Sequence, residues 1–287
     1  MTDSTSGPTR LTGLAAISDR FDAAILDQWG VLHDGVKAPA GAVEAITAMA
    51  AAGKRMVVLS NSARFGSDSR DKLIALGYPA GIFEGVVTSG ETTHDMLRDR
   101  SDPLFAGLGK SVLLISRVTT LTDGLDYRIA DTAETADFVL LGSSTAPEKS
   151  LAVDYAVTLD RAAARGLKLV CANPDRIGVA ETGLTEGPGT LAAYYEKIGG
   201  TVRYLGKPHP EVYERAMALL GDIAPARIIT VGDSLEHDIA GGRRAGCQTV
   251  FVEAGIHAAD LAKPDGITKL SAHFGVTPDF VIPKLLW

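Results

Sequence analysis

The fold of this chain is decided by the stretch Ala24-Ile25-Leu26-Asp27-Gln28-Trp29-Gly30-Val31. Three apolar residues lead into an aspartate and then a glycine, a pattern typical of a buried parallel strand that ends in a turn. Ligands of open α/β sheets bind at the carboxyl ends of such strands. We therefore interpret Asp27 as a side chain placed to act on a substrate. Trp29, two residues on, is a bulky indole without acid–base chemistry.

The same kind of apolar run recurs along the chain. We predict strands over residues 23–27, 55–60, 201–206, 227–231 and 248–252, the second reading RMVVLS. Helices are predicted over residues 11–20, 89–100 and 210–220, the second capped by Ser89. A further helix is predicted over residues 238–245, and the segment up to Arg10 is predicted to be frayed. Alternating strands and helices predict parallel sheets with helices on both faces.

Composition excludes several classes of protein. The chain has 287 residues, enough for one large α/β domain or two smaller ones, and 46% of them are hydrophobic. A net charge of -7 argues against nucleic acid as a partner. Cys171 and Cys247 lie far apart in apolar runs, which predicts two buried free thiols. No apolar run is long enough for a bilayer and the N-terminal segment does not resemble a signal peptide, so we expect no membrane association and a cytoplasmic location.

Polar residues follow four of the predicted strands. Carboxylates that lie close together repel one another and need a cation, and oxygen ligands suit Mg²⁺. A lysine and a serine hydroxyl suit the oxygens of a phosphoryl group. Together they predict phosphoryl transfer with an aspartate as nucleophile. The four fragments are Asp27 with Gly30, Ser60-Asn61, Gly206-Lys207-Pro208, and Gly232-Asp233-Ser234 followed by Asp238.

This ordered set closely resembles the haloacid dehalogenase superfamily, in particular subfamily IIA, which includes sugar-phosphate, pyridoxal-phosphate and 4-nitrophenyl-phosphate phosphatases. The segments Leu59-Ser60-Asn61 and Asn173-Pro174-Asp175 fit that branch. The resemblance implies an α/β fold: a doubly wound, Rossmann-like parallel-sheet core over residues 1–87 and 203–287. An inserted α/β type II cap over residues 88–202 would close over the site, exclude water and choose the substrate.

The resemblance also implies roles for individual residues. Asp27 is expected to be the nucleophile that forms an aspartyl-phosphate, and Ser60, Asn61 and Lys207 to bind the phosphoryl group. Mg²⁺ is expected at Asp27, the Trp29 carbonyl and Asp233, with Asp238 supporting the metal or Lys207. The implied activity is Mg²⁺-dependent hydrolysis of a small phosphate monoester, with a small phosphorylated metabolite as the partner. Apart from the resemblance, an apolar cap surface could form a homodimer.

Trp29 departs from the family pattern, because most family phosphatases carry a second aspartate there that protonates the leaving group. That help accelerates a reaction by about 10²–10⁴-fold. We therefore expect a slow phosphatase, or one suited to leaving groups that need no proton. His33 and Asp34 are alternatives for the missing acid, although turn polarity is sufficient to explain both. Trp29 itself is interpreted as a side chain that packs as a hydrophobic wall over the pocket.

Several residues, and the function itself, allow more than one interpretation from the sequence. Arg64 either contacts phosphate or forms a surface ion pair, and His237 is interpreted as a surface residue. Asn173 and Asp175 either face the substrate or form a turn beside Pro174. Without the second aspartate, the protein is alternatively a metal- and phosphate-binding sensor that turns nothing over. A dinucleotide-binding domain is set aside, because no GxGxxG follows the first strand.

Overall fold

The computed structural model describes residues 7–143, 151–180 and 183–287. The chain forms two compact units. Unit 1 comprises the chain up to Ser60 together with Gly66–Val87 and Val212–Trp287, and unit 2 comprises Asn61–Phe65 and Thr88–Glu211. The predicted domain boundaries, residues 1–87 and 203–287 for a catalytic core and 88–202 for a cap, concern function and remain a proposal.

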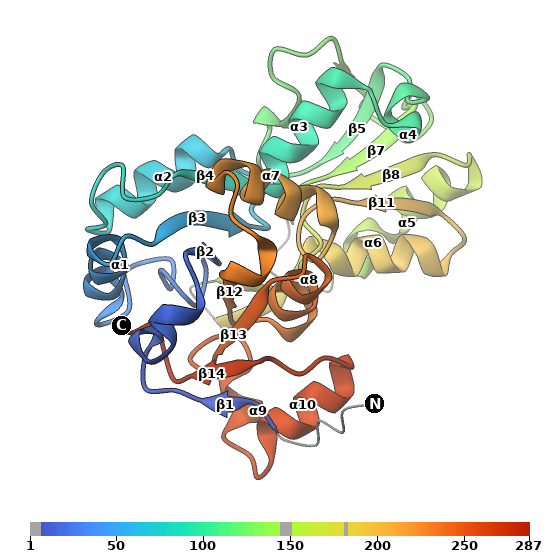
Figure 1. The fold of residues 1–287 in the computed structure, drawn as a ribbon. Coiled ribbons are helices and arrows are strands. Elements are labelled where there is room, and N and C mark those ends of the chain that lie inside the picture. The colour runs from blue at the N-terminus through green and yellow to red at the C-terminus, as the bar shows by residue number, and fades with distance from the viewer. Residues whose placement is uncertain (1–6, 144–150, 181–182) are drawn as a thin grey trace. The chain divides into compact units, whose positions relative to one another are not determined.

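Unit 1 is built on a sheet with strand order β1-β14-β13-β12-β2-β3-β4, in which the pairs from β1 to β3 are parallel (Figure 1). β2 lies beside β12, which follows it by about two hundred residues of sequence, and Leu26 pairs with Val231. The strands are β1 (Thr9–Arg10), β2 (Ala23–Leu26), β3 (Arg55–Ser60), β4 (Gly85–Thr88), β12 (Ile228–Gly232), β13 (Gln248–Val252) and β14 (Phe280–Ile282).

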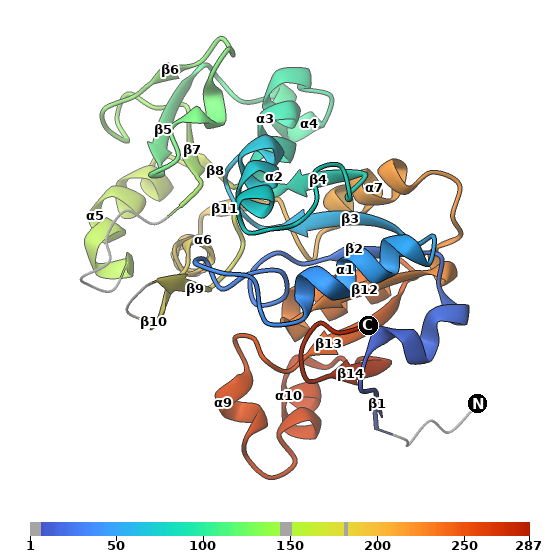
Figure 2. The ribbon, with the colours of Figure 1, turned by 90° about the vertical axis from the view of Figure 1, so that its left-hand side faces the viewer.

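Helices cover both faces of this sheet, as the strand pattern predicts. Ala24 and Leu26 pack on the face covered by α1 (Ala42–Ala51), whereas Ile25 packs on the opposite face with α7 (Pro210–Leu220). Figure 2 shows α1 lying across the strands of unit 1. The other helices of the unit are α2 (Gly66–Ala75), α8 (Ala240–Arg244), α9 (Ala258–Leu261) and α10 (Gly266–Phe274), with 3₁₀ helices at Leu14–Arg20 and Pro225–Arg227.

Unit 2 contains a second parallel sheet with order β11-β8-β7-β5-β6 and an antiparallel hairpin of β9 and β10. Alternate residues of β8 pack on opposite faces: Leu169 against α5 and α6, and Val170 with residues of α3 and α4. Its strands are β5 (Ser111–Ile115), β6 (Arg128–Ile129), β7 (Phe138–Leu141), β8 (Lys168–Cys171), β9 (Ile177–Ala180), β10 (Gly183–Glu186) and β11 (Thr201–Tyr204). Its helices are α3 (Ser89–Asp99), α4 (Pro103–Ala106), α5 (Leu151–Ala164) and α6 (Pro188–Lys197), with a 3₁₀ helix at Thr120–Thr122.

Some local predictions were wrong. Residues Thr9–Arg10 are not frayed, because they pair with β14. The first helix begins at Leu14 and is 3₁₀. Thr88, not Ser89, caps α3: its hydroxyl accepts a hydrogen bond from the Glu91 N–H at 3.1 Å. The helix predicted from Asp238 begins instead at Ala240, after a π-helical turn at Leu235–Ile239.

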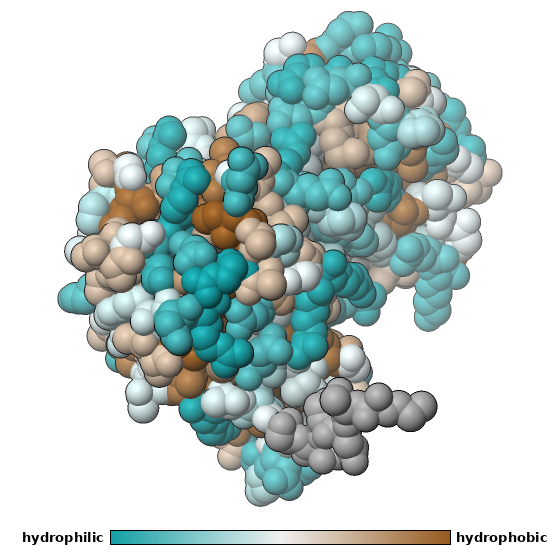
Figure 3. All heavy atoms as spheres, viewed as in Figure 1, coloured by the Kyte–Doolittle hydropathy of each residue, from teal (hydrophilic) through white to brown (hydrophobic). Residues whose placement is uncertain are grey.

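Other surface and core features agree with the composition. Cys171 in unit 2 and Cys247 in unit 1 are buried free thiols, as predicted. Among the described residues, no helix is both long and apolar enough to cross a membrane. On the face shown in Figure 3, hydrophobic residues are interspersed with hydrophilic ones.

Candidate active site

Asp27 and Asp233 follow neighbouring parallel strands of unit 1. The Asp27 N–H donates to the Val231 carbonyl at 2.8 Å, which extends the pairing of β2 with β12 by one residue. Asp233 directly follows Gly232, the last residue of β12. Because the two strands run in the same direction, both aspartates leave the sheet at its carboxyl edge. Ligand sites of open α/β sheets form at this edge.

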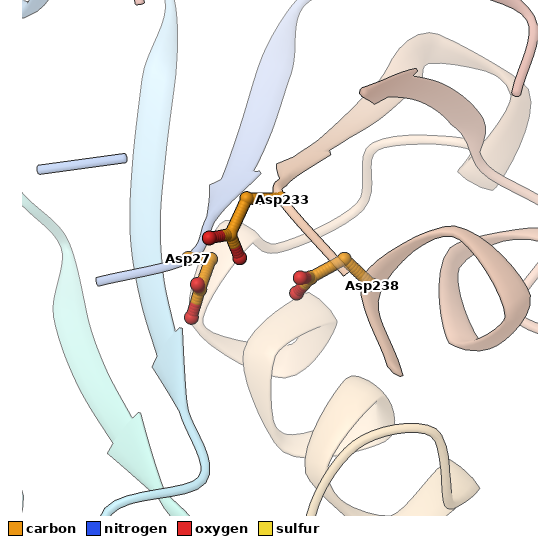
Figure 4. Close-up of side chains that lie close together, drawn as sticks. All are labelled: Asp27, Asp233 and Asp238. Carbon is orange, nitrogen blue, oxygen red and sulfur yellow. The ribbon is translucent and has the colours of Figure 1, made fainter. Parts of the chain in front are cut away.

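Asp238 completes a cluster of three carboxylates. One oxygen from each of Asp27, Asp233 and Asp238 lies within 4.8 Å of the others, and all three residues are buried (Figure 4). Three buried carboxylates at this separation repel one another strongly unless a cation compensates them. Their oxygens are hard donors, which suit Mg²⁺ or another hard divalent cation better than a thiophilic metal. The donor set therefore fits the predicted metal.

The loop after β13 holds Asp233 in place. The Ile256 N–H donates to Asp233 Oδ2 at 2.9 Å. A side chain at Gly30 or Gly255 would collide with the Asp233 carboxylate, and Gly30 also has a positive φ of 77°. The prediction from sequence included Gly30 but missed Gly255 and Ile256. The sequence feature that could have indicated these residues is Gly255, which lies three residues beyond the predicted strand 248–252 at the same edge of the sheet.

Asp238 is presented by the π-helical turn Leu235–Ile239. Its Oδ2 accepts a hydrogen bond from the Ser234 N–H at 3.1 Å, and a side chain at Gly232 would collide with its carboxylate. His237 is buried, contrary to the surface location predicted for it, and its Nδ1 lies 3.0 Å from Ser234 Oγ. Hydrogen bonds within the turn therefore fix the direction of Asp238.

Trp29 packs within its own loop. Its ring lies edge-on to His33 with centroids 4.9 Å apart, and Lys72 Nζ lies 5.2 Å from the indole centroid. A side chain at Gly35, which has a φ of 96°, would collide with the indole. The ring is thus held by contacts with an imidazole, a glycine and an ammonium group. These contacts fix the ring, and its role as a wall over the pocket stays a prediction.

Neither alternative for the missing acid has the required chemistry. Burial lowers the pKa of His33 to about 4, with a further contribution from the charge of Lys72, so the imidazole is neutral at pH 7. Its Nδ1 accepts from the Gly35 N–H at 2.9 Å. Backbone N–H groups of Lys37 and Val36 lower the pKa of Asp34, which keeps that carboxylate ionised. A neutral imidazole and an ionised carboxylate are both poor proton donors.

The remaining predicted residue of unit 1 is Ser60. It is the last residue of β3, next to β2, and is buried at the same carboxyl edge as Asp27. Arg64, which follows in the loop, is exposed, and its N–H donates to Ser62 Oγ at 3.2 Å. This hydrogen bond forms a turn in the loop. The contact of Arg64 with phosphate stays a prediction.

Unit 2 contains the other predicted phosphate ligands. Asn61 and Lys207 are buried and joined by two hydrogen bonds: the Lys207 N–H donates to Asn61 Oδ1 at 2.6 Å, and Asn61 Nδ2 donates to the Lys207 carbonyl at 3.2 Å. Asn61 Nδ2 also donates to Asp175 Oδ1 at 2.7 Å. Asn173 Oδ1 accepts from the Asp175 N–H at 3.0 Å, which is the turn considered as the alternative role for Asn173.

Two family models match the chain. The model described as haloacid dehalogenase-like hydrolase matches residues 24–124, and a HAD-hydrolase-like model matches residues 204–286. The first range contains Asp27, Trp29 and Ser60, and the second contains Lys207, Asp233 and Asp238. The two matches therefore include the four sequence fragments from which phosphoryl transfer was predicted.

Several curated proteins are similar over most of the chain. Ribonucleotide monophosphatase NagD of Escherichia coli is 29% identical over 241 residues, covering 82% of this chain and 89% of that protein. 5'-Nucleotidase YutF of Bacillus subtilis is 26% identical over 82% of this chain and 88% of its own. D-glycerol 3-phosphate phosphatase of Mycobacterium tuberculosis is 28% identical over 86% of this chain and 67% of its own.

Solved structures agree in fold. A haloacid dehalogenase-like hydrolase from Brucella suis superposes with a TM-score of 0.81 and 28% identity, covering 97% of this chain and 100% of that one. The p-nitrophenyl phosphatase of Archaeoglobus fulgidus, 23% identical, has a TM-score of 0.71 over 92% of this chain and 96% of its own. With its motifs, fold and relatives in agreement, the chain belongs to the haloacid dehalogenase-like hydrolases, in the subfamily IIA branch of phosphatases.

Proposed function

We propose that this protein hydrolyses a small phosphate monoester in a Mg²⁺-dependent reaction, through an aspartyl-phosphate on Asp27. The observation that carries the proposal is the buried cluster of Asp27, Asp233 and Asp238 at the carboxyl ends of adjacent strands. A hard cation held by such a cluster supplies charge neutralisation to an incoming phosphoryl group. The similarity to NagD, YutF and the mycobacterial enzyme, which all release phosphate from small phosphate monoesters according to their names, supports the same class of substrate.

The proposed reaction has two displacement steps at phosphorus. In the first, an Asp27 carboxylate oxygen forms a bond to phosphorus while the bond from phosphorus to the ester oxygen breaks, and the leaving group departs with the electron pair. In the second, water attacks the aspartyl-phosphate, the Asp27 oxygen–phosphorus bond breaks, and inorganic phosphate and the free carboxylate are formed. Ser60, Asn61 and Lys207 are proposed to hold the phosphoryl oxygens.

The leaving group decides the substrate preference in this proposal. Trp29 cannot donate a proton, His33 is neutral, and Asp34 is held ionised by turn N–H groups. A departing alkoxide would therefore leave unprotonated, which is unfavourable because its conjugate acid has a high pKa. Phenolates and carboxylates leave readily without a proton. We therefore propose aryl or acyl phosphates as better substrates than alkyl phosphates such as sugar phosphates.

A steady-state assay tests this function. Phosphate release would be measured from 4-nitrophenyl phosphate, an acyl phosphate and a panel of phosphorylated metabolites, with Mg²⁺ and with a chelator in its place. The proposal expects Mg²⁺-dependent turnover that is fastest for the aryl and acyl esters. Equal rates with chelator would contradict the metal requirement, and equal rates for alkyl and aryl esters would contradict the absence of a general acid.

The second candidate function is favoured by Trp29 alone. Because its indole is fixed between Gly35, His33 and Lys72, it leaves the chain without the family's acid–base residue. A protein that binds Mg²⁺ and phosphate but releases no phosphate from any ester would be a sensor. Calorimetry with Mg²⁺ and inorganic phosphate, beside the turnover assay, separates the two functions.

The proposed substrate, location, domain roles and assembly follow the predictions from the sequence. The substrate is a small phosphorylated metabolite in the cytoplasm, unit 2 acts as the substrate-selecting cap, and the assembly is a homodimer. Sedimentation at several protein concentrations tests the assembly.

A further inference from the structure

The inference concerns Asp175, which follows β8 in unit 2 and for which the sequence left substrate contact and a turn beside Pro174 as alternatives. Its carboxylate accepts a hydrogen bond from Asn61 Nδ2 at 2.7 Å. A carboxylate is a poor ligand for a phosphoryl group, because both are anions. It is a strong acceptor for an amide N–H, since hydrogen bonds to ionised groups are shorter and stronger than neutral ones.

The Asn61 side chain makes hydrogen bonds to both polar groups of the Lys207 backbone, the N–H and the carbonyl. Oδ1 accepts from the Lys207 N–H at 2.6 Å, and Nδ2 donates to the Lys207 carbonyl at 3.2 Å. Asn61 and Lys207 are 3% and 4% exposed, so water contributes little to this pairing. Two hydrogen bonds from one rigid amide fix both the position and the rotation of the Lys207 peptide groups.

Only one orientation of the Asn61 amide allows both hydrogen bonds to Lys207. If the amide were rotated by 180°, its NH₂ group would face the Lys207 N–H, and its oxygen would face both the Lys207 carbonyl and the Asp175 carboxylate. Donors would then meet donors and acceptors would meet acceptors. The Asp175 carboxylate oxygen accepts from Nδ2 and so favours the same orientation as the Lys207 backbone. Asp175 thus strengthens the preference for the orientation that makes both hydrogen bonds to Lys207.

The surrounding backbone leaves little space for an alternative arrangement. Gly206 has a φ of 115°, and a side chain there would come within 2.6 Å of Asn61 Oδ1 and 2.9 Å of Pro174 Cδ. Ser89 Oγ donates to the Ala172 carbonyl at 2.6 Å, which ties the segment before Asp175 to α3. The segments around Asn61, Asp175 and Lys207 are therefore packed directly together within unit 2.

We propose that Asp175 is a positioning residue, which acts through the Asn61 amide to hold Lys207 in the conformation that binds phosphate. This rests on the proposed function for the role of Lys207. It assigns Asp175 no contact with the substrate, and it predicts that an acceptor at residue 175 matters more than a negative charge there.

The first test is amide hydrogen exchange at Lys207, measured by NMR on the full chain. Asp175→Ala is expected to accelerate exchange of the Lys207 N–H, because the Asn61 amide loses one of the acceptors that fix its orientation. Asp175→Asn, which retains an oxygen acceptor, is expected to exchange as the unmodified protein does. Asp160→Ala is the matched control, since Asp160 also accepts one side-chain hydrogen bond in unit 2, from Tyr194 at 2.8 Å. Unchanged exchange in Asp175→Ala would overturn the proposal.

The second test is the affinity for inorganic phosphate in the presence of Mg²⁺, by calorimetry. Asp175→Ala is expected to weaken phosphate binding by roughly 10–100-fold, the range found when groups that orient a site's ligands are removed. Asn61→Ala should weaken it similarly, and the double variant should be no weaker than Asn61→Ala alone, because Asp175 then has nothing to orient. Mg²⁺ affinity should not change, since the three metal carboxylates belong to unit 1.

The outcomes separate this proposal from its alternatives. Tighter phosphate binding in Asp175→Ala would place the carboxylate against the ligand and overturn the proposal, as would additive losses in the double variant. An Asp175→Asn variant as weak as Asp175→Ala would also overturn it, by showing that charge is what counts. Neither measurement needs turnover. A protein that hydrolyses no ester would refute the proposed function, while hydrogen exchange would still decide the role of Asp175.

Discussion

Asp27 is the residue on which the proposed chemistry depends most directly. Asp27→Asn is expected to reduce hydrolysis of 4-nitrophenyl phosphate to the background rate, because a carboxamide cannot form the phospho-enzyme. The fold should persist, since the substitution leaves the backbone hydrogen bond from residue 27 to Val231 unchanged. Asp34→Asn is the control, because Asp34 lies in the same loop but is exposed and accepts only turn N–H groups. Wild-type rates in Asp27→Asn would exclude it as the nucleophile.

Trp29 sets the expected dependence on the leaving group. Trp29→Asp should raise the rate on alkyl phosphates by up to about 10²–10⁴-fold, the usual effect of a positioned acid–base residue. The gain will be smaller to the extent that losing the indole disturbs Gly35 and Lys72, which pack against it. Rates for a series of esters with graded leaving-group pKa check this: the slope should be steep in the native protein and shallow in the variant. A shallow slope in both would indicate another acid.

Asp233 is expected to dominate metal affinity, because the Ile256 N–H and two close glycines hold its carboxylate in a single direction. Asp233→Ala should weaken Mg²⁺ binding sharply, as measured by calorimetry. Glu253→Ala serves as the control, since Glu253 lies at the start of the same loop but pairs with Arg10. Unchanged affinity in Asp233→Ala would show that the metal lies elsewhere.

Among the elements, the π-helical turn Leu235–Ile239 has the most direct consequence for the site. π-Helical turns are rare and occur frequently at functional sites. The buried Tyr213 hydroxyl on α7 donates to the His237 carbonyl at 3.0 Å and lies 3.4 Å from the Asp238 carbonyl. A side chain at Gly241 would collide with the Tyr213 ring. α7 thus fixes the turn that carries a metal-site carboxylate.

Removing that hydroxyl tests the link between α7 and the metal. Tyr213→Phe should lower the free energy of unfolding by about 1–2 kcal/mol, because a buried carbonyl loses its donor, and should also weaken Mg²⁺ binding. Tyr195→Phe is the matched control: its buried hydroxyl donates to the Leu167 carbonyl at 2.7 Å in unit 2, so stability should fall without any change in Mg²⁺ affinity. Equal Mg²⁺ affinities in the two variants would contradict the role of α7.

Sequence pattern predicted the long elements and missed the short ones for a physical reason. Strand β3 and helix α7 have the predicted bounds, because each is a continuous apolar or amphipathic run with clear ends. The two-residue strand β1 exists only because β14 pairs with it, and that pairing joins opposite ends of the chain. The π-helical turn likewise accepts a hydrogen bond from Tyr213, which lies 24 residues earlier in the chain. Local periodicity contains no information about such partners.

Much of the candidate site was predictable because its residues lie at the ends of apolar runs. Asp27, Ser60 and Asp233 each end or follow an apolar run, so their shared edge follows from parallel strands alone. The role proposed for Asp175 was not predictable, because it depends on a hydrogen bond to Asn61, 114 residues away. Residue type showed that Asp175 was polar and near a strand end, and its partner could come only from the three-dimensional structure.

For the molecule as a whole, the two thiols report on the two units separately. Burial raises the pKa of Cys171 to about 12 and that of Cys247 to about 11, so both stay protonated at pH 8 and react poorly with alkylating reagents. Pulse alkylation at pH 8 with increasing urea, read by mass spectrometry, is expected to show little labelling without urea. Each thiol should then label where its own unit unfolds. Rapid labelling of either one in native buffer would contradict its burial.

The interleaved order of the strands has a consequence for synthesis on the ribosome. The centre of the unit 1 sheet needs β12 beside β2, and Asp233 emerges 206 residues after Asp27. At typical translation speeds that interval lasts roughly 10–40 s. The whole of unit 2 is made within it and can fold first, while β2 waits with the backbone N–H and C=O groups of one edge unpaired. The nascent chain therefore passes through a period in which a chaperone, or premature pairing with another chain, competes for the strand that precedes Asp27.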